Sequence, residues 1–271
     1  MNDDPFSIFS GNSIKTYNKT AWDTRAKSGC RFSNTAPTSE YQKAAEALAG
    51  NPWLPDNISG LAVLNLASGG GGQSGLLASL GASVTVVDIS PVMLENDRRL
   101  AQEQGYDIRV IEASMDHLPM LQDAEFDLVI HPVSTCYLPN LQDVFEEVAR
   151  VSKSGATYIN HHKQPASMQT SADPVNGHYQ LLEPYAFKGP LPPVTGKMHR
   201  EDGTLEFLHS LQDLLGGLCK AGFYIDDFKE ADHADPDAAP GSFGHRSAYV
   251  PPFMSIKAVR RERAHLSTII T

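Results

Sequence analysis

The 271-residue sequence has only three cysteines and no long apolar run. Cys30, Cys136 and Cys219 lie far apart and show no Cys-x-x-Cys spacing, which argues against a disulfide framework or a zinc site. No stretch approaches the roughly 20 consecutive apolar residues of a membrane-spanning helix. The N-terminal residues have neither the basic start nor the apolar core of a signal peptide. We therefore expect a cytoplasmic protein that binds no metal and does not interact with a membrane.

Basic residues are also scarce. Lys and Arg together number 22 against 32 Asp and Glu, so the formal net charge is −10. Binding to nucleic acid needs a basic surface, and the basic residues cluster only at 260–263, so we expect no nucleic-acid partner. The length and the apolar fraction of 41% suit one α/β domain with additions. The sequence leaves the oligomeric state open.

Glycine is abundant in one short stretch, where it follows a strand-like pattern. An apolar run at 61–66 leads into a glycine-rich segment at 68–72, and leucines at helical spacing follow. A second apolar run at 84–87 ends on Asp88. A strand, a glycine loop, a helix and a second strand ending on an acid form half of a nucleotide-binding unit. The missing Cβ atoms let backbone N–H groups approach a ligand, and the acid is placed to accept hydrogen bonds from a ribose.

The same alternation of strands and helices continues beyond this unit. Strands are expected at 107–112, 126–133 and 156–162, with helices at 90–105 and 140–155 between them. This rhythm predicts a doubly wound parallel sheet of the α/β class. Right-handed crossovers would then bring the ends of the strands together at one crevice.

The flanking segments differ from this core in composition. We divide the chain into an N-terminal helical arm at 1–50, a cofactor-binding core at 51–162, an inserted cap at 163–203 and a C-terminal part at 204–271. We expect a short helix at 13–29 that carries Tyr17 and Trp22 and a second helix at 39–49. The arm either packs its aromatic residues on the core or closes as a lid. In the C-terminal part we expect an amphipathic helix capped by Thr204, followed by two antiparallel edge strands.

Several stretches resemble the motifs of one known family. In order along the chain they read VLNLASGGGGQS, VTVVDISPVML, EASMDHLPML, EFDLVI and FEEVARVSKSG, with a weaker match in LCKAGFYIDDFKE. Their order and spacing over residues 60–160 resemble the class I S-adenosylmethionine-dependent methyltransferases, specifically the small-molecule group called methyltransferase type 11. The resemblance implies a Rossmann-like sheet of seven strands with an antiparallel last strand. It also implies S-adenosyl-L-methionine as the cofactor and a small molecule as the methyl acceptor.

The resemblance also implies a set of cofactor-binding residues. They are Asn65, Ala67, Ser68, Gly69, Gly71, Gln73, Asp88, Ile89, Met93, Ser114, Met115 and His131. Asp88 matches the acid that binds the two ribose hydroxyls of the cofactor. Asn65 and Ala67 stand where the family usually has an acid and a glycine, so Asn65 lacks the charge that would face the ammonium group of the cofactor.

The acceptor side is less defined. Methyl transfer needs a base only when the acceptor carries a proton with a pKa above the working pH, and histidine titrates near neutrality. We expect His131, His162 and His209 to serve as base or to position the acceptor. Residues expected to contact the substrate are Tyr17, Trp22, Tyr137, His178 and Tyr179.

Two other functions are compatible with parts of the sequence. An NAD(P)-dependent oxidoreductase of the Rossmann type also has a glycine loop and a strand-end acid. Against it, the loop lacks a clean G-x-G-x-x-G that opens a helix, and no Tyr-x-x-x-Lys is present. The second alternative is a methyltransferase-like protein that binds the cofactor without turnover.

Overall fold

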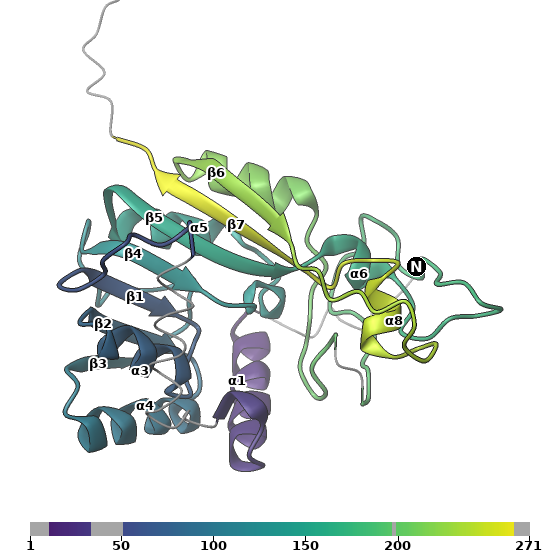
Figure 1. Cartoon of the computed structure of the whole chain (residues 1–271), viewed down its shortest axis with the longest axis horizontal. Helices are drawn as coiled ribbons and strands as arrows, with labels where there is room; N and C mark the ends of the chain where they lie inside the picture. The colour runs from purple at the N-terminus through teal and green to yellow at the C-terminus, as the bar shows by residue number, and fades with distance from the viewer. Residues whose placement is uncertain (1–10, 34–50, 197–198, 263–271) are drawn as a thin grey trace, which may run out of the picture.

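The computed structural model describes residues 11–33, 51–196 and 199–262, and the helix expected at 39–49 lies outside them. Its centre is a seven-stranded sheet of order β3-β2-β1-β4-β5-β7-β6 (Figure 1). The strands are β1 (Ala62–Leu66), β2 (Ser83–Asp88), β3 (Ile108–Glu112), β4 (Phe126–His131), β5 (Ser152–Lys163), β6 (Phe223–Glu230) and β7 (Phe253–Arg260). Strands β1 to β5 pair in parallel, and β7 is antiparallel to both neighbours. This topology confirms the expected fold class.

Helices cover both faces of the sheet. The helices of the described segments are α1 (Gly11–Lys27), α3 (Gly72–Ser79), α4 (Pro91–Gln104), α5 (Gln142–Val151), α6 (Pro165–Gln169), α7 (Gly217–Lys220) and α8 (Phe243–Ser247), of which α1, α6 and α8 lie at or beyond one edge of the sheet (Figure 1). Single helical turns are η1 (Arg31–Ser33) and η2 (Thr135–Tyr137), and η3 (Gln212–Gly216) is a π-helical turn that leads into α7. On one face α5, η3 and α7 pack on β1, β4 and β5, with Phe145 and Tyr158 fully buried. On the other face α3 packs on β1, β2 and β4 through Leu77.

Helix α4 begins and ends where the sequence indicates. Ser90 caps α4, since its hydroxyl accepts a hydrogen bond from the Met93 N–H at 3.1 Å and Pro91 occupies the first helical position. Gly105 ends α4 in the left-handed conformation, with φ of 69°. These two local signals fix the position of α4 behind the loop that follows β1.

The helix expected to begin at Thr204 begins later, so that prediction was wrong. The segment 204–209 is extended because its N–H groups have partners elsewhere: Leu205 donates to Asn18 Oδ1 at 2.8 Å, and Phe207 donates to the Cys136 carbonyl at 2.7 Å. The helical turn starts at Ser210, whose hydroxyl accepts from the Asp213 N–H at 3.1 Å. Tertiary hydrogen bonds therefore override the helical spacing of the leucines.

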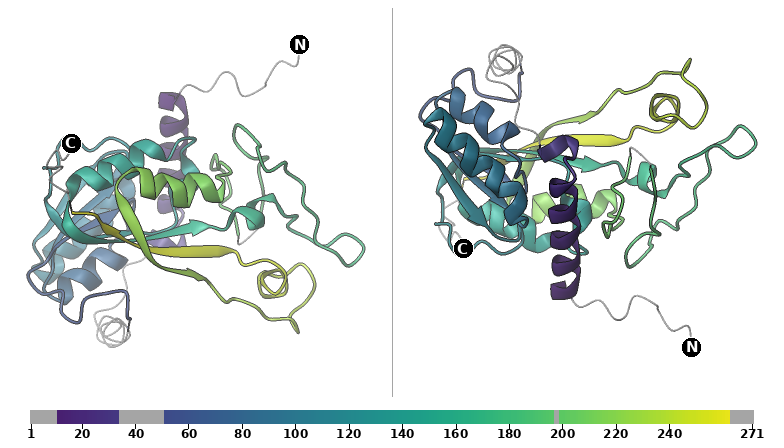
Figure 2. Two further views of the ribbon diagram at one scale, coloured as in Figure 1. Left: turned by 90° about the horizontal axis from the view of Figure 1, so that it is seen from above. Right: turned by 90° about the horizontal axis from the view of Figure 1, so that it is seen from below.

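Three further segments lie at or beyond the carboxyl ends of the parallel strands. Figure 1 shows α1 standing across this edge of the sheet, and Figure 2 shows the cap and the β6–β7 connection reaching past the end of β5. Arg246 of α8 joins the latter two, because its buried guanidinium donates to the carbonyl oxygens of Ser167 and Ser171 at 2.7 and 3.0 Å. Among the residues described, no helix is long and apolar enough to span a bilayer.

Candidate cofactor and acceptor site

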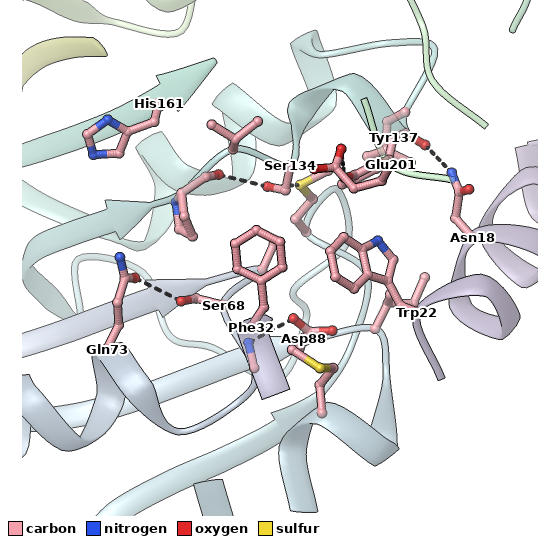
Figure 3. A pocket seen from close by; sticks show the side chains of 18 of the residues that line it. Asn18, Trp22, Phe32, Ser68, Gln73, Asp88, Ser134, Tyr137, His161 and Glu201 are labelled. Atoms are coloured by element: carbon pink, nitrogen blue, oxygen red, sulfur yellow. Dashed lines mark hydrogen bonds between the residues drawn. The ribbon is translucent and has the colours of Figure 1, made fainter. Parts of the chain in front are cut away.

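A cavity of about 730 Å³ opens at the carboxyl edge of the sheet, a volume typical of small-molecule sites. It is lined by the loops after β1, β2, β3 and β4, by the end of β5 and the start of β7, and by α1 and η1. Figure 3 shows Asp88 and Ser68 on one side of this space and His161 on another, with Trp22 and Asn18 projecting from α1. Chain segments that are far apart in sequence therefore meet at one site.

The glycine loop after β1 is held in an unusual backbone conformation. Ala67, Gly70 and Gly71 all have positive φ, of 50°, 123° and 85°. A Cβ on Gly69 would lie 2.8 Å from the Met93 Cβ, and one on Gly70 would lie 2.1 Å from the Phe32 carbonyl oxygen. Both glycines are therefore needed for close packing of the loop against α4 and η1.

Asp97 fixes this loop from the side of α4. Its carboxylate accepts hydrogen bonds from the Gly70 N–H at 2.8 Å and the Gly71 N–H at 3.1 Å, and also from the Ser74 hydroxyl. Complete burial of the side chain raises the pKa of Asp97 to about 6, and the three hydrogen bonds oppose that shift. Asp97 is not among the residues predicted from the sequence, because an acid in the middle of a helix carries no local sign of its partner.

Asp88 lies at the carboxyl end of β2 and lines the cavity. Oδ1 accepts from the Ser90 N–H and Oδ2 from the Gly69 N–H, each at 2.8 Å. Burial raises the pKa of Asp88, and its backbone hydrogen bonds act in the opposite direction. Each carboxylate oxygen can accept more than one hydrogen bond, so the group can still accept two hydroxyl donors from a ligand.

Four of the residues that the resemblance implies as cofactor-binding lie together beside Asp88. Ile89, Met93, Ser114 and Met115 all line the cavity. The Ser114 hydroxyl donates to Asp116 Oδ1 at 2.6 Å, and Asp116 forms an ion pair with Lys15 of α1 at 2.7 Å. This ion pair connects α1 to the side of the cavity that Ser114 lines.

The other side of the glycine loop is polar. Ser68 and Gln73 line the cavity and are hydrogen-bonded to each other at 2.8 Å, while Ala67 and Gly69 contribute the loop itself. Asn65 is fully buried on β1, outside the cavity lining, and neither atom of its amide has a hydrogen-bond partner among the described residues. A buried amide without partners is costly, by about 1–3 kcal/mol. A polar ligand group or a water molecule behind the loop would satisfy it.

The structure brings none of the three expected catalytic histidines to the cavity lining. His131 is fully buried; Nδ1 is bonded to the Tyr158 hydroxyl at 2.7 Å and Nε2 to the Ser134 hydroxyl at 2.6 Å. Burial lowers the pKa of His131 to about 3. His162 is also buried, between Thr135 and Asn160, with its pKa well below the usual range.

His209 lies in the extended segment before η3 rather than on a helix. Its Nε2 is 3.2 Å from the Thr135 carbonyl oxygen, and burial lowers its pKa. It lines a second cavity between α5, η3 and the cap. Like His131 and His162, it therefore faces other protein groups instead of the main cavity.

Of the residues expected to contact the substrate, Trp22 and Tyr137 line the main cavity. Their rings meet edge to face, with centroids 5.6 Å apart. Tyr17 is 45% exposed and lines a separate groove along α1. His178 is exposed in the cap, and the Tyr179 hydroxyl is bonded to His245 Nδ1 at 2.9 Å, outside the lining.

Several residues of the cavity lining are not among the site residues predicted from the sequence. The main ones are Asn18, Phe32, Glu201, His161 and His233. Successive residues of a strand face opposite sides of the sheet, so only one of the adjacent histidines of β5 can face the cavity. This rule predicts that His161 and His162 face opposite sides of the sheet, but it does not predict which of the two faces the cavity.

Glu201 brings a buried ionic network to the wall of the cavity. It accepts from the Tyr137 hydroxyl at 3.0 Å and forms an ion pair with Lys163. Lys163 also pairs with Glu206, which in turn pairs with Arg200. Two cations and two anions therefore balance, and Lys163 is the main reason that the pKa of Glu201 is lowered to about 2 despite burial.

No metal site is evident in the part of the chain that the structure describes: no group of three or more His, Cys, Asp or Glu side chains there could hold an ion. The residues present instead suit a nucleoside ligand. The carboxylate of Asp88 can accept further hydrogen bonds, and it lies beside apolar residues and a glycine loop that has no room for side chains. Behind this loop, the amide of Asn65 has no hydrogen-bond partner among the described residues. These features fit the nucleoside and amino-acid parts of S-adenosylmethionine.

Comparison with known proteins agrees with this geometry. The family model described as "Methyltransferase domain" matches residues 64–160. The "Uncharacterized methyltransferase YbaJ" of Bacillus subtilis is 33% identical over 236 residues, which cover 81% of this chain and 91% of that protein. A sarcosine/dimethylglycine N-methyltransferase of Aphanothece halophytica is 31% identical over 162 residues, covering 58% of this chain and 52% of that protein.

A solved structure shows the same fold. The S-adenosylmethionine-dependent methyltransferase from Mesorhizobium loti superposes with a TM-score of 0.64 at 24% identity, covering 81% of this chain and all of that one. The fold and site thus define a class I S-adenosylmethionine-dependent methyltransferase. Within that class, the chain belongs to the methyltransferase type 11 family, with S-adenosyl-L-methionine as cofactor.

Proposed function

We propose that this chain transfers a methyl group from S-adenosylmethionine to a small-molecule acceptor within the 730 Å³ cavity. The observation that carries the proposal is the continuity of this cavity. One space joins Asp88 and the glycine loop to a second wall formed by α1, the end of β5 and the start of β7. The first part suits the cofactor, and the second part leaves room for an acceptor beside it.

The cofactor-side residues divide by the part of the cofactor that each would hold. Asp88 would accept both ribose hydroxyls, and Ile89, Met93 and Met115 would enclose the adenine, with Ser114 at its polar edge. The loop from Ala67 to Gly71, with Ser68 and Gln73, would contact the methionine end. Asn65 lies behind that end, and its unsatisfied amide supports a polar group or a bridging water there. His131 would act indirectly, since it fixes Ser134 in the cavity wall.

When bound, the cofactor supplies a methyl group already activated on a positively charged sulfur. The task left to the chain is to align the acceptor for in-line displacement and to keep water away. Trp22 and Tyr137 present two aromatic rings to the cavity, and such rings stabilise a nearby positive charge by cation–π contact. Asn18 holds α1 in place by donating to the carbonyl oxygens of Tyr137 and Leu205, each at 3.0 Å.

Both the shape of the cavity and the names of the relatives support a small-molecule acceptor. The site is recessed among α1, Glu201 and the β6–β7 connection, and its aromatic and aliphatic lining favours a compact apolar body. The Aphanothece relative is named for methylation of sarcosine and dimethylglycine, which are small molecules. The net charge of −10 gives no support to a nucleic-acid substrate.

Calorimetric titration with S-adenosylhomocysteine, and separately with NAD(H) and NADP(H), tests the proposal. We expect saturable binding of S-adenosylhomocysteine and none of the nicotinamide cofactors. Binding of a nicotinamide cofactor alone would revive the oxidoreductase alternative. Binding of S-adenosylhomocysteine without methyl transfer to any acceptor in a broad panel would favour a binding protein without turnover.

A further inference from the structure

His161 is held rigidly at the acceptor wall of the cavity. It lies on β5 directly opposite Ser255 of the antiparallel strand β7, and its Nδ1 is 2.6 Å from the Ser255 hydroxyl oxygen. Both residues line the cavity. Among the described residues, Nε2 of His161 has no hydrogen-bond partner. The strand pairing therefore fixes one ring nitrogen and leaves the other available to a ligand.

The other ionisable groups of the lining, apart from His233, are engaged in ion pairs or hydrogen bonds. Lys15 is paired with Asp116, and the Asp88 carboxylate is bonded to two backbone N–H groups on the cofactor side. Glu201 is neutralised within its network with Lys163 and accepts from Tyr137. None of these groups is free to take a proton from an acceptor.

His233 is the other described histidine of the lining, and it differs from His161 in its setting. It is exposed on the β6–β7 connection and packs against the rings of Phe243 and Phe253, with centroids 5.4 and 6.0 Å away. No side chain fixes either nitrogen of its ring within the described segments. His161 is thus the better-oriented imidazole of the two.

The protonation state of His161 suits a base. Burial lowers its pKa below 6.5, so the ring is neutral at neutral pH. The ionisable groups that interact with it electrostatically are His131 on β4 and His162 on β5, and burial keeps both neutral as well. His233 faces the same cavity from the β6–β7 connection.

We propose that His161 is the base for a hydroxyl acceptor, with Nδ1–H donated to Ser255 and Nε2 directed at the acceptor oxygen. This inference rests on the proposed methyl transfer. The acceptor proton passes to Nε2 while the oxygen–methyl bond forms. The sulfur–methyl bond breaks at the same time, and its electron pair stays on sulfur, which becomes a neutral thioether. The imidazolium then releases its proton to water.

The surrounding charges favour a hydroxyl over an amine. A protonated amine would need an unpaired anion beside it, but the acid on the acceptor wall, Glu201, belongs to a network of net charge zero. A neutral amine attacks through its own lone pair and needs no base beforehand. A phenolic hydroxyl has a pKa near 10 and gains most from a neutral imidazole. Trp22, Phe32 and Phe253 supply an aromatic lining for the body of such an acceptor.

This assignment is tested with two methyl acceptors as probes, of which only one needs a base. An alkylphenol must lose its proton during the reaction, whereas thiophenol is already largely ionised near neutral pH. We expect His161→Asn to lower kcat/KM for the alkylphenol by about 100-fold or more and for thiophenol by less than about threefold. Affinity for S-adenosylhomocysteine should not change. His117→Gln removes an exposed histidine that lies outside the cavity lining and should leave both reactions unchanged.

Ser255 is a positioning residue, and its variants provide a readout that does not depend on turnover. In ¹⁵N NMR spectra of the imidazole groups, wild-type His161 should be neutral with its proton on Nδ1. Ser255→Ala should remove this tautomer preference and shift the pH profile for the alkylphenol, while Ser255→Thr should restore both. A His161 ring with its proton on Nε2 in the wild type would contradict the assignment.

The remaining outcomes separate this inference from the proposed function. Equal losses on both probes in His161→Asn, or methylation of alkylamines but of no alkylphenol or catechol, would overturn the role of His161 and leave methyl transfer intact. If the wild-type protein did not bind S-adenosylhomocysteine, the proposed function and this inference would both fail.

Discussion

The carboxylate of Asp97 accepts a hydrogen bond from the Gly70 N–H at 2.8 Å, and this contact ties the glycine loop to α4. The side chain is fully buried, and its pKa is raised to about 6 from the ordinary 3.8. The loop that would contact the cofactor therefore depends on an acid that keeps its proton to a higher pH in the folded protein than in the unfolded chain. The stability of the fold should reflect this preference.

Because of Asp97, the free energy of unfolding should decrease as the pH rises from about 4 to about 6. In this interval the folded protein keeps the proton that the unfolded chain has lost, so the contribution of Asp97 falls by up to about 1.4 kcal/mol per pH unit. The free energies of unfolding of the wild type and of Asp97→Asn are measured by urea titration at several pH values. The difference between them should fall with this slope and become independent of pH above about 6. A difference that stays constant over the interval would contradict the shifted pKa.

Replacing Ala67 by glycine should stabilise the protein. It has φ of 50°, a conformation that L-residues other than Asn and Asp adopt at a cost of about 1 kcal/mol or more. Ala67→Gly should therefore raise the free energy of unfolding by about 0.5–1 kcal/mol. The matched control is Ala101→Gly within α4, where the same change should lower stability by a similar amount. If both variants lost stability, the loop would not be strained at Ala67.

Lys163 should be essential to the stability of the cap. It is buried between Glu201 and Glu206, so Lys163→Met would leave two buried carboxylates without their common partner. We expect a loss of about 3–5 kcal/mol in chemical denaturation. Lys153→Met removes one partner of the more exposed Lys153–Asp127 pair and should cost less than about 1 kcal/mol. Similar losses in the two variants would show that burial of the network does not matter.

Local signals predict much of this structure. A few adjacent residues are enough to predict strand β2, the acid Asp88 at its end and the helix cap at Ser90. The order of such units along the chain predicts the parallel sheet. The part of the cavity around Asp88 and the glycine loop follows from this order, because the residues that line it come directly after the parallel strands.

The rest depends on contacts between distant residues. The Gly70–Asp97 hydrogen bond joins positions 27 apart, and the bond from Leu205 to Asn18 that keeps the 204–209 segment extended joins positions 187 apart. Whether His161 or its neighbour faces the cavity is set by the register of β5 against β7. Neither a periodic pattern nor a motif contains this information.

Asp88 provides the most direct test of the whole account. If its carboxylate holds both ribose hydroxyls, Asp88→Ala should weaken binding of S-adenosylhomocysteine by about 1–3 kcal/mol, roughly 5- to 150-fold in the dissociation constant. Asp107→Asn, an exposed acid before β3, is the control and should bind like the wild type. The decisive measurement is isothermal titration calorimetry of the three proteins with S-adenosylhomocysteine. The predicted result is a dissociation constant raised in Asp88→Ala alone, and an unchanged constant in that variant, with its fold intact by circular dichroism, would contradict the placement of the cofactor.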